Sequence, residues 1–418
     1  MEEKLFSQIK EELTQNILPY WPKYAKDLKN GGFFGAIAND NTPNAQEWRG
    51  IVMVSRFLWT YSAAARLLHD ASLLDMADYA HSYMMKDFYD PYNGGMYWSV
   101  QADGIPLVNR KQVYGDAFAI YALSEYAAAV KELRGQDNPS RQIMGQALSI
   151  YQLLEQFALD KVAGGYLEAL AADWTFTTET KLSPKDIDCD KSMNTNLHVM
   201  EAYTNLYRTL PLVCPELKDT RRELGASLEL LVRTHVEKIL NPKDYHLDLY
   251  FNKDWSRTGR DEISYGHDIE ASWLLWEAAG ELGNKALMQE LQPVVLKIAE
   301  VALAEGFDEE TGGFENCMDE DGRKDTTRIW WNQAEALNGF YNAWEMTGST
   351  AYEAAVYKVW HWIKEKQADK TDGEWYWAVS KDGTPHLDED KGGNWKTSYH
   401  NARCCMELLR RRGEFQKR

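Results

Sequence analysis

The chain has 418 residues, enough to bury a large hydrophobic core, and carries a formal net charge of −18 at pH 7. A field of that sign repels phosphate backbones and anionic lipid surfaces, so nucleic acid and membranes are excluded as expected partners. The five cysteines include no C-x-x-C pair, which excludes a zinc ribbon, and the acidic start Met1-Glu2-Glu3 is unlike a secretory signal, so the sequence predicts a cytoplasmic protein.

Apolar residues recur with a period of about 3.6 in twelve successive stretches of the chain. The helices predicted from them span residues 2–28, 48–69, 72–89, 110–134, 138–159, 191–210, 216–240, 266–281, 283–304, 330–347, 350–367 and 396–413. Short links, as at residues 69–72 and 280–284, join each even-numbered helix to the next odd-numbered one, and short links make neighbouring helices antiparallel.

The loop after each odd-numbered helix carries a repeated pattern of glycines and aromatic residues. Four loops contain a glycine pair, and a fifth is a weaker copy: Gly31-Gly32, Gly94-Gly95, Gly164-Gly165, Gly312-Gly313 and Asp372-Gly373. Three are followed by an Asp-Gly turn, which predicts a short hairpin with a type I′ turn: Asp103-Gly104, Asp321-Gly322 and Asp382-Gly383. Residues 245–250 lie midway in the longest gap and are strand-like but lack glycine, so we interpret them as a degenerate fourth copy.

Six helical pairs with no cover of their own predict an all-α (α/α)6 barrel, a closed double ring of twelve helices with the short β-hairpins at one end. We expect a single catalytic domain over residues 1–418. An open solenoid has the same periodicity, although atypical capping repeats are not evident. The even-numbered helices are richer in tryptophan, alanine and other small residues, which suits tight packing around an axis, so we assign them to the inner ring.

Polar and aromatic residues gather where the even-numbered helices begin. They are Arg56, Tyr114, His198, His267 with Glu270, Trp330 and Trp331 with Gln333 and Glu335, and Trp395 with Lys396 and His400. Parallel inner helices present all their N-termini at one end of a ring, so these side chains are expected to converge on one mouth. Taken singly, each has a plainer explanation, because Arg56 can pair with Glu47 and the aromatic residues can be core. The histidines outside the pattern, which we interpret as structural, are His69, His81, His235, His361 and His386.

Histidine titrates near neutrality, so it can both remove and return a proton. Two imidazoles on opposite sides of a substrate carbon, with an arginine, a tyrosine and a third histidine to stabilise an enediolate, would epimerise a carbon next to a carbonyl. Three histidines can also hold zinc, but the sequence has no H-E-x-x-H or other tight ligand spacing, so we expect no metal.

Six segments closely resemble those of the cellobiose 2-epimerases, within the N-acylglucosamine 2-epimerase superfamily. They are residues 55–63, 113–119, 191–208, 265–274, 331–336 and 395–401. The resemblance implies an (α/α)6 barrel that interconverts glucose and mannose at the reducing end of β-1,4-linked disaccharides such as cellobiose, lactose or mannobiose. It implies no required cofactor and a small disaccharide as the partner, and we expect a monomer or a weak homodimer.

The resemblance also implies roles for individual residues. His267 and His400 look like the two general acid/base residues, while His198 and Arg56 resemble the groups that hold the C1 and C2 oxygens, with Tyr114 beside them. The residues that resemble substrate contacts are Asn194, Glu270, Trp331, Trp377 and Trp395.

Other functions stay open at this point. The same intermediate protonated at C1 would make the protein an aldose–ketose isomerase, and an N-acylglucosamine 2-epimerase belongs to the same superfamily. An inverting glycosidase of the same fold needs two opposed carboxylates, for which Glu270 and Glu335 are candidates. A sugar- or protein-binding scaffold without catalysis is the remaining alternative.

Overall fold

The computed structural model describes residues 1–259 and 262–413, so residues 260–261 and 414–418 of the predicted domain lie outside the described part. Within that part, helices occupy twelve stretches in agreement with the predicted number. The six that correspond to the predicted inner helices are α3 (Ile51–Leu68), α5 (Val113–Arg134), α7 (Met193–Val213), α9 (Tyr265–Leu282), α11 (Trp330–Thr347) and α13 (Tyr399–Arg411). The others are α1 (Glu3–Glu11) continuing through a π-helical turn into α2 (Leu18–Tyr24), then α4 (Leu74–Tyr83), α6 (Asp137–Leu153), α8 (Lys218–Thr234), α10 (Lys285–Glu305) and α12 (Thr350–Trp362).

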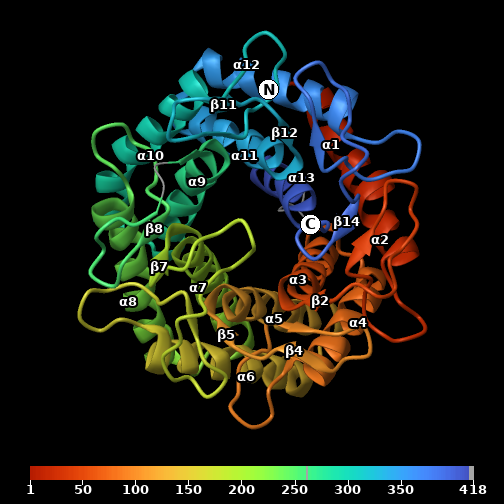
Figure 1. Ribbon diagram of the computed structural model, residues 1–418, viewed down its shortest axis with the longest axis vertical. Helices are drawn as coiled ribbons and strands as arrows, with labels where there is room; N and C mark the ends of the chain where they lie inside the picture. The colour runs from red at the N-terminus through yellow and green to blue at the C-terminus, as the bar shows by residue number, and fades with distance from the viewer. Residues whose placement is uncertain (260–261, 414–418) are drawn as a thin grey trace.

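The helices form two concentric rings around a central opening (Figure 1). Helices α3, α5, α7, α9, α11 and α13 line the opening, and the remaining helices lie outside them. Each inner helix packs against the next in chain order, and α13 packs back against α3, so the circuit is closed. This closure rules out the open solenoid. The inner helices are buried on nearly all faces, which explains why small residues such as Ala64 and Ala119 are frequent there.

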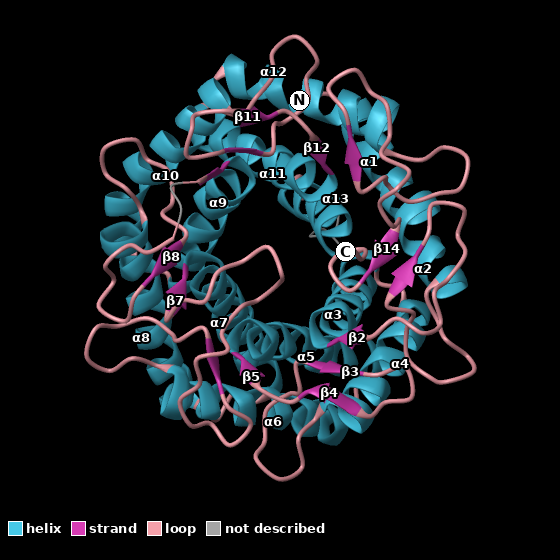
Figure 2. Cartoon of the chain, viewed as in Figure 1, coloured by secondary structure: helices cyan, strands magenta, loops and turns pink. Residues whose placement is uncertain are grey.

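Two-residue antiparallel strands join each repeat to the next around one end of the rings (Figure 2). The six pairs are β2 (Arg49–Gly50) with β3 (Ser99–Val100), β5 (Lys111–Gln112) with β6 (Ala169–Leu170), β7 (Lys191–Ser192) with β8 (Tyr250–Phe251), β9 (Ile263–Ser264) with β10 (Cys317–Met318), β12 (Arg328–Ile329) with β13 (Ala378–Val379), and β14 (Gly392–Gly393) with β1 (Ala36–Ile37). We call these six pairs the strand belt. In each, the strand immediately before an inner helix pairs with the loop of the following repeat. The belt therefore fixes where the inner helices begin.

Two of the Asp-Gly turns connect paired strands within one loop. They join β3 to β4 (Pro106–Val108) and β10 to β11 (Lys324–Asp325). The expected type I′ geometry is wrong, because φ is positive at Gly104 (+86°) and not at Asp103. Gly104 instead donates its N–H to the carbonyl of Gln101, and the register shifts between Ser99 and Val100. This is a type I turn followed by a left-handed glycine, the usual three-residue hairpin loop.

The fourth loop is the degenerate copy that the sequence predicts. Leu240 bridges Leu247 as Tyr89 bridges Met96 in the second loop. Tyr245 has φ +66°, where Gly94 of the second loop has φ +70°. The left-handed conformation is thus kept at the first glycine position although the glycine is not, whereas His246, at the position of Gly95 (φ +68°), lacks a positive φ.

Buried ion pairs mark the same loops. In five of the six repeats a buried aspartate at the loop start binds the cation that precedes the inner helix: Asp27 with Arg49, Asp90 with Lys111, Asp160 with Lys191, Asp308 with Arg328 and Asp369 with Lys391. The fourth repeat has Asn241 and Ile263 at these positions. It has lost both charges together, which avoids leaving either one buried and unpaired.

The last inner helix begins later than predicted. It starts at Tyr399 and not at residue 396, so Trp395 lies in the preceding loop. The Lys396 ammonium is fully buried and binds Glu374 Oε2 at 2.7 Å and the Lys391 carbonyl at 2.8 Å. These contacts hold the loop against the ring and replace helical hydrogen bonds. Across residues 1–259 and 262–413, every helix is too short or too polar to cross a membrane.

Candidate active site

All ten residues predicted to form the site line one cavity of about 270 Å³. They are Arg56, Tyr114, Asn194, His198, His267, Glu270, Trp331, Trp377, Trp395 and His400. The cavity lies where the inner helices begin, because most of these side chains come from the first two turns of α3, α5, α7, α9, α11 and α13. Sequence reasoning missed Lys185, Asn316 and Ile329 in its wall, and it placed Trp330 at the mouth without giving it a role. Lys185 comes from the loop between β6 and β7, which reaches over the central opening in Figure 2.

Two of the three histidines are held by carboxylates at Nδ1. His198 Nδ1 lies 2.8 Å from Glu201 Oε2, and His400 Nδ1 lies 2.7 Å from Glu335 Oε1. A carboxylate at Nδ1 fixes both the ring orientation and the tautomer, with Nε2 on the opposite edge of the ring. Burial lowers the pKa of His400 well below its usual value, and the positive charges of Arg56 and Arg403 lower it further. His400 is therefore neutral near pH 7.

His267 is held differently. Its Nδ1 lies 2.7 Å from the hydroxyl oxygen of Ser264, directly before α9. The ring packs 4.7 Å from that of Trp331, which also lies 5.7 Å from the ring of His400. Burial lowers the pKa of His267 to about 3, and the neighbouring His198 contributes. His267 is thus a second neutral imidazole, and both it and His400 pack against Trp331.

Arg56 supplies a buried positive charge to the same cavity. It donates from Nη1 to the Trp395 carbonyl at 2.6 Å and from Nη2 to the Tyr114 hydroxyl at 3.2 Å. Its guanidinium also lies 4.8 Å from the ring centre of Phe118. The fixed fork can stabilise an oxygen anion in the cavity, since donors in a water-poor site act more strongly than in water.

Tryptophans form much of the remaining wall. Trp330 and Trp377 pack with ring centres 4.5 Å apart, and Trp395 packs 6.0 Å from Trp98. Within the described chain, four buried polar atoms of cavity-lining residues have no hydrogen-bond partner: Arg56 Nε, Asn194 Oδ1, Glu270 Oε2 and Trp330 Nε1. Flat apolar surfaces beside unsatisfied donors and acceptors suit a ligand with C–H faces and hydroxyl groups.

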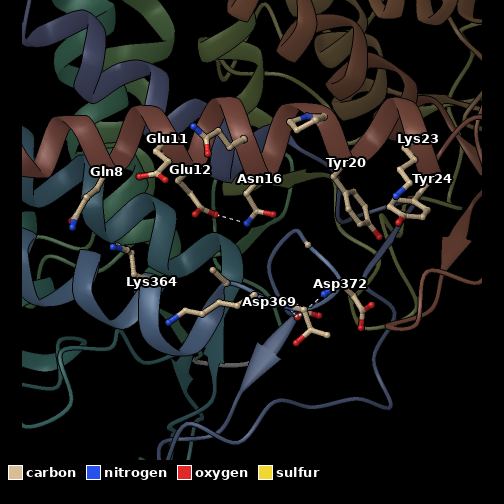
Figure 3. Close-up of a pocket in the computed structure, with 16 residues that line it drawn as sticks. Gln8, Glu11, Glu12, Asn16, Tyr20, Lys23, Tyr24, Lys364, Asp369 and Asp372 are labelled. Atoms are coloured by element: carbon tan, nitrogen blue, oxygen red, sulfur yellow. Dashed lines mark hydrogen bonds between the residues drawn. The ribbon is translucent and has the colours of Figure 1, made fainter.

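A larger groove of about 570 Å³ lies on the outer surface between the first helix and the last hairpin (Figure 3). Its walls include Glu12, Asn16, Tyr20, Lys364 and Asp372. None of the predicted site residues lines it, and no histidine does. The smaller central cavity is the better candidate because it gathers three histidines and an arginine from different helices.

The histidines predicted to be structural lie away from the cavity. His235 binds the Leu231 carbonyl, His81 binds Gln146, and His386 binds Ser380. His69 ends α3 in a left-handed conformation with φ +53°. These contacts are local and agree with the structural interpretation.

Comparison with known proteins gives a consistent family. A model of the N-acylglucosamine 2-epimerase (GlcNAc 2-epimerase) family matches residues 32–404. The chain is 40% identical to cellobiose 2-epimerase from Bacteroides fragilis over 409 residues, which cover 98% of this chain and 100% of that protein. The chain belongs to the N-acylglucosamine 2-epimerase family.

Other members of this family support the assignment. Cellobiose 2-epimerase from Dictyoglomus turgidum is 36% identical over 97% of this chain and 98% of its own. The solved structure of cellobiose 2-epimerase from Bacillus thermoamylovorans B4167 superposes with a TM-score of 0.88 at 34% identity, over 98% of this chain and 100% of that one. The match to the family model spans all six inner helices except the end of α13, and it includes every predicted site residue.

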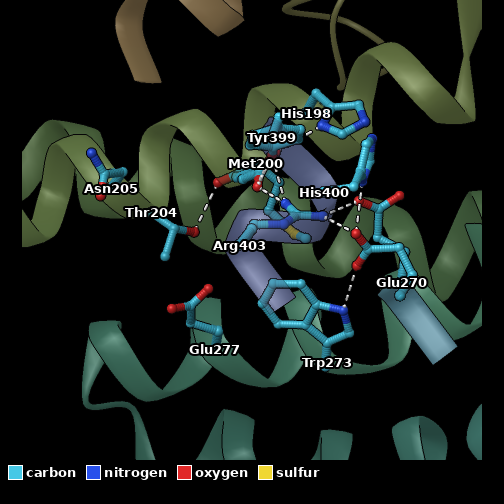
Figure 4. A network of polar contacts seen from close by, with 12 residues as sticks. His198, Met200, Thr204, Asn205, Glu270, Trp273, Glu277, Tyr399, His400 and Arg403 are labelled. Atoms are coloured by element: carbon cyan, nitrogen blue, oxygen red, sulfur yellow. Dashed lines mark hydrogen bonds and ion pairs between the residues drawn. The ribbon is translucent and has the colours of Figure 1, made fainter. Parts of the chain in front are cut away.

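The epimerase cavity has a charged floor that the sequence reasoning did not identify. Arg403 contacts carboxylates from three other inner helices, and Trp273 donates to Glu335 Oε2 at 3.0 Å (Figure 4). The sequence did hold one signal, because Arg403 is a charged residue on a helix predicted to be buried. Burying an unpaired guanidinium is costly, so such a residue indicates buried carboxylate partners. Glu201 and Glu335 lie in segments that resemble the cellobiose 2-epimerases, but the sequence did not indicate that they hold the histidines.

Proposed function

We propose that this family member is a cellobiose 2-epimerase, which inverts C2 of the glucose or mannose at the reducing end of β-1,4-linked disaccharides. The observation that carries the proposal is the meeting of three imidazoles and the Arg56 guanidinium on one cavity of about 270 Å³. The relatives that share most of the chain at 34–40% identity include cellobiose 2-epimerases. The proposal extends to a single (α/α)6 barrel domain with short hairpins at one end, acting as a monomer or a weak homodimer.

The proposed reaction begins with opening of the sugar ring, which is followed by removal of the C2 proton. The sugar binds as its ring form, and one histidine assists its opening to the aldehyde, which makes the C2 proton acidic. One of His267 and His400 then removes that proton. Both are neutral near pH 7, since burial lowers the pKa of each, so either has a free nitrogen lone pair.

The product of this step is a cis-enediolate, which carries its negative charge mainly on the C1 oxygen and keeps the hydroxyl hydrogen at C2. Arg56 and the Tyr114 hydroxyl face the cavity as donors for that charge, and His198 lines it as an acceptor for the remaining hydroxyl group. Arg56 is held from two sides, by the Trp395 carbonyl and by Tyr114, so little reorganisation is needed when the charge develops.

The second histidine completes the inversion. Rotation about the C2–C3 bond presents the other face of the enediolate. The second imidazole takes a proton from solvent and delivers it to C2, and the first imidazole releases the proton it removed to solvent. The negative charge of the intermediate favours the protonated form of the nearby imidazole, which offsets the effect of burial. Proton removal and return need no redox group, and the chemistry proposed uses neither a metal nor a cofactor.

The carboxylates of the floor argue against the glycosidase. Glu270 and Glu335 offer oxygens within 4.8 Å of each other and of His400, and both bind the same Arg403 nitrogen. Inverting glycosidases hold their two carboxylates about 6.5–9.5 Å apart to admit water. The same cluster could be a metal site by residue type, but the Arg403 guanidinium already lies between its carboxylates.

The test is incubation with cellobiose, lactose, mannobiose, N-acetylglucosamine and glucose in heavy water, followed by sugar analysis. We expect C2 epimers of the disaccharides carrying deuterium at C2. His267→Ala and His400→Ala should each lower turnover by at least about 100-fold, whereas the control His81→Ala, on outer helix α4, should not. Epimer without deuterium would refute proton removal at C2. Ketose as the main product would indicate the isomerase, and released monosaccharide the glycosidase.

A further inference from the structure

Arg403 lies beneath the cavity and connects four inner helices. It follows His400 by three residues on α13, has 1% of its surface exposed, and is not part of the cavity wall. Its Nη2 donates to Glu270 Oε1 at 2.5 Å and to Glu335 Oε1 at 2.7 Å, and its Nη1 contacts Glu201 Oε1 (Figure 4). One guanidinium therefore binds carboxylates from α7, α9 and α11.

Two of these carboxylates each hold a histidine of the site. Glu201 binds His198 Nδ1 through its second oxygen, and Glu335 binds His400 Nδ1 through the same oxygen that binds Arg403. His267 is outside this set, because its Nδ1 faces the Ser264 hydroxyl. Arg403 is thus connected to two of the three imidazoles through one carboxylate each.

The balance of charge around Arg403 is unfavourable. Three buried carboxylates share one guanidinium, and the other titratable group in contact with it is the Tyr399 hydroxyl. Burial raises the pKa of Glu270 to about 7, and the charge of Glu335 adds to this. Burial would also raise the pKa of Glu201, but Arg403 and His198 hold it at about 2. Burial raises the pKa of Glu335, against the lowering effect of Arg403.

The state of these carboxyl groups decides which imidazole nitrogen carries a proton. An ionised carboxylate accepts a hydrogen bond from Nδ1–H and leaves Nε2 with a free lone pair. A protonated carboxyl group donates to Nδ1 and so forces the proton onto Nε2, which can then no longer act as a base. In a Ser-His-Asp triad, a wrong tautomer of this kind lowers kcat by about 10⁴-fold.

We propose that Arg403 is a positioning residue that keeps Glu201 and Glu335 ionised, so that His198 and His400 both present an unprotonated Nε2 to the substrate. For its effect on turnover the inference rests on the proposed epimerase function. A purely structural ion pair would predict a change in stability alone. The two accounts therefore differ in imidazole tautomer, in the pH profile and in the split between kcat and KM.

The first experiment uses the unmodified protein, labelled with ¹⁵N-histidine. The nitrogen chemical shifts distinguish a protonated from an unprotonated ring nitrogen without any turnover. We expect Nδ1–H on both His198 and His400 at neutral pH, assigned by comparison with His198→Gln and His400→Gln. A proton on Nε2 of either residue overturns the proposal. Failure of the protein to epimerise any disaccharide would instead overturn the proposed function, because the tautomers do not depend on it.

The second experiment compares Arg403→Met with Arg403→Lys. The methionine variant should lower kcat at neutral pH by at least about 100-fold with KM changed less than threefold, since Arg403 does not touch substrate. Its activity should recover as pH rises, because the carboxyl groups ionise again, and the lysine variant should fall between because it keeps the charge without the fork. Arg49→Met, a buried arginine paired with Asp27, is the matched control and should leave both tautomers unchanged.

The variants decide the proposal even if Arg403→Met does not fold. The lysine variant keeps a cation in the cluster, and its tautomers can then be measured in place of the methionine variant's. A folded Arg403→Met or Arg403→Lys protein with reduced stability but native tautomers and kcat would show that Arg403 is structural only.

Discussion

The ion pair of Asp90 and Lys111 offers a sharp test of how the repeats are stabilised. The pair is buried at 2.8 Å, with 2% and 0% of the two side chains exposed. Replacing Lys111 by isoleucine leaves the Asp90 carboxylate buried without its counter-charge. We expect this change to lower the free energy of unfolding by about 3–5 kcal/mol, the usual cost of breaking a buried pair from one side.

The fourth repeat shows how both charges can be removed together. Asn241 stands at the position of Asp90 and its Oδ1 still accepts the N–H of Lys243, as Asp90 Oδ1 accepts that of Tyr92. The double variant Asp90→Asn/Lys111→Ile reproduces this solution and should cost no more than about 2 kcal/mol. If Asp90→Asn alone also costs about 3–5 kcal/mol, the coupling energy is at least about 4 kcal/mol. Coulomb's law at 2.8 Å and an effective dielectric constant of 20 bounds it near 6 kcal/mol.

The assay is equilibrium urea unfolding followed by tryptophan fluorescence and circular dichroism, with free energies compared only where the two curves coincide. The reciprocal control is Ile263→Lys with Asn241→Asp, which installs the pair in the fourth repeat and should cost less than Ile263→Lys alone. Additive costs in the second repeat, with no coupling between the two sites, would refute the reasoning.

Three further outcomes follow from the site and its loops. Tyr114→Phe removes one of the two groups that orient Arg56. We expect kcat to fall roughly 10–100-fold with little change in KM, because a hydrogen bond to a charged group contributes about 1.5–3 kcal/mol. An unchanged kcat would remove Tyr114 from the mechanism. Gly95→Ala should destabilise the protein by more than about 2 kcal/mol, measured as a lower urea midpoint. The reason is that φ is +68° at Gly95 and an added Cβ would lie 2.6 Å from Trp174. The control is Gly135→Ala, which is also at positive φ but in open space and should destabilise the protein less. The pKa of His267 in the folded protein, about 3, lies below its unfolded value near 6.5. Between these pH values only the unfolded chain binds the proton, so the stability of the protein should fall as pH drops from about 6.5 to 3. His267→Gln should flatten that decline, and an equally steep loss of stability in the variant would show that another group causes it.

The inner helices and their order could be predicted because each consists of one long apolar stretch bounded by turn residues. The convergence of the ten predicted residues on one cavity could be predicted because they recur at one place in that pattern, as His198 and His400 do near helix N-termini; their roles stay a prediction. The strand belt could not, since two-residue strands carry no periodicity and their partners belong to the next repeat. Arg403 was missed because the sequence does not show that its three carboxylates converge from helices far apart in the chain.

The type I′ error has the same physical origin. An Asp-Gly pair fits either a two-residue turn or the end of a three-residue loop, and the choice depends on which neighbouring strand is paired. In the second loop β3 is already bonded to β2 of the preceding repeat, and the turn adjusts by one residue around it. Local sequence therefore predicted the bend and the glycine at φ +86°, while the tertiary partner decided the turn type.

The strand belt limits what can enter the molecule. Because β14 pairs with β1, the six separate strand pairs link the repeats in a closed circuit, so widening one gap would strain the neighbouring repeats. We therefore expect the mouth of the central cavity to keep nearly the same width when a ligand enters.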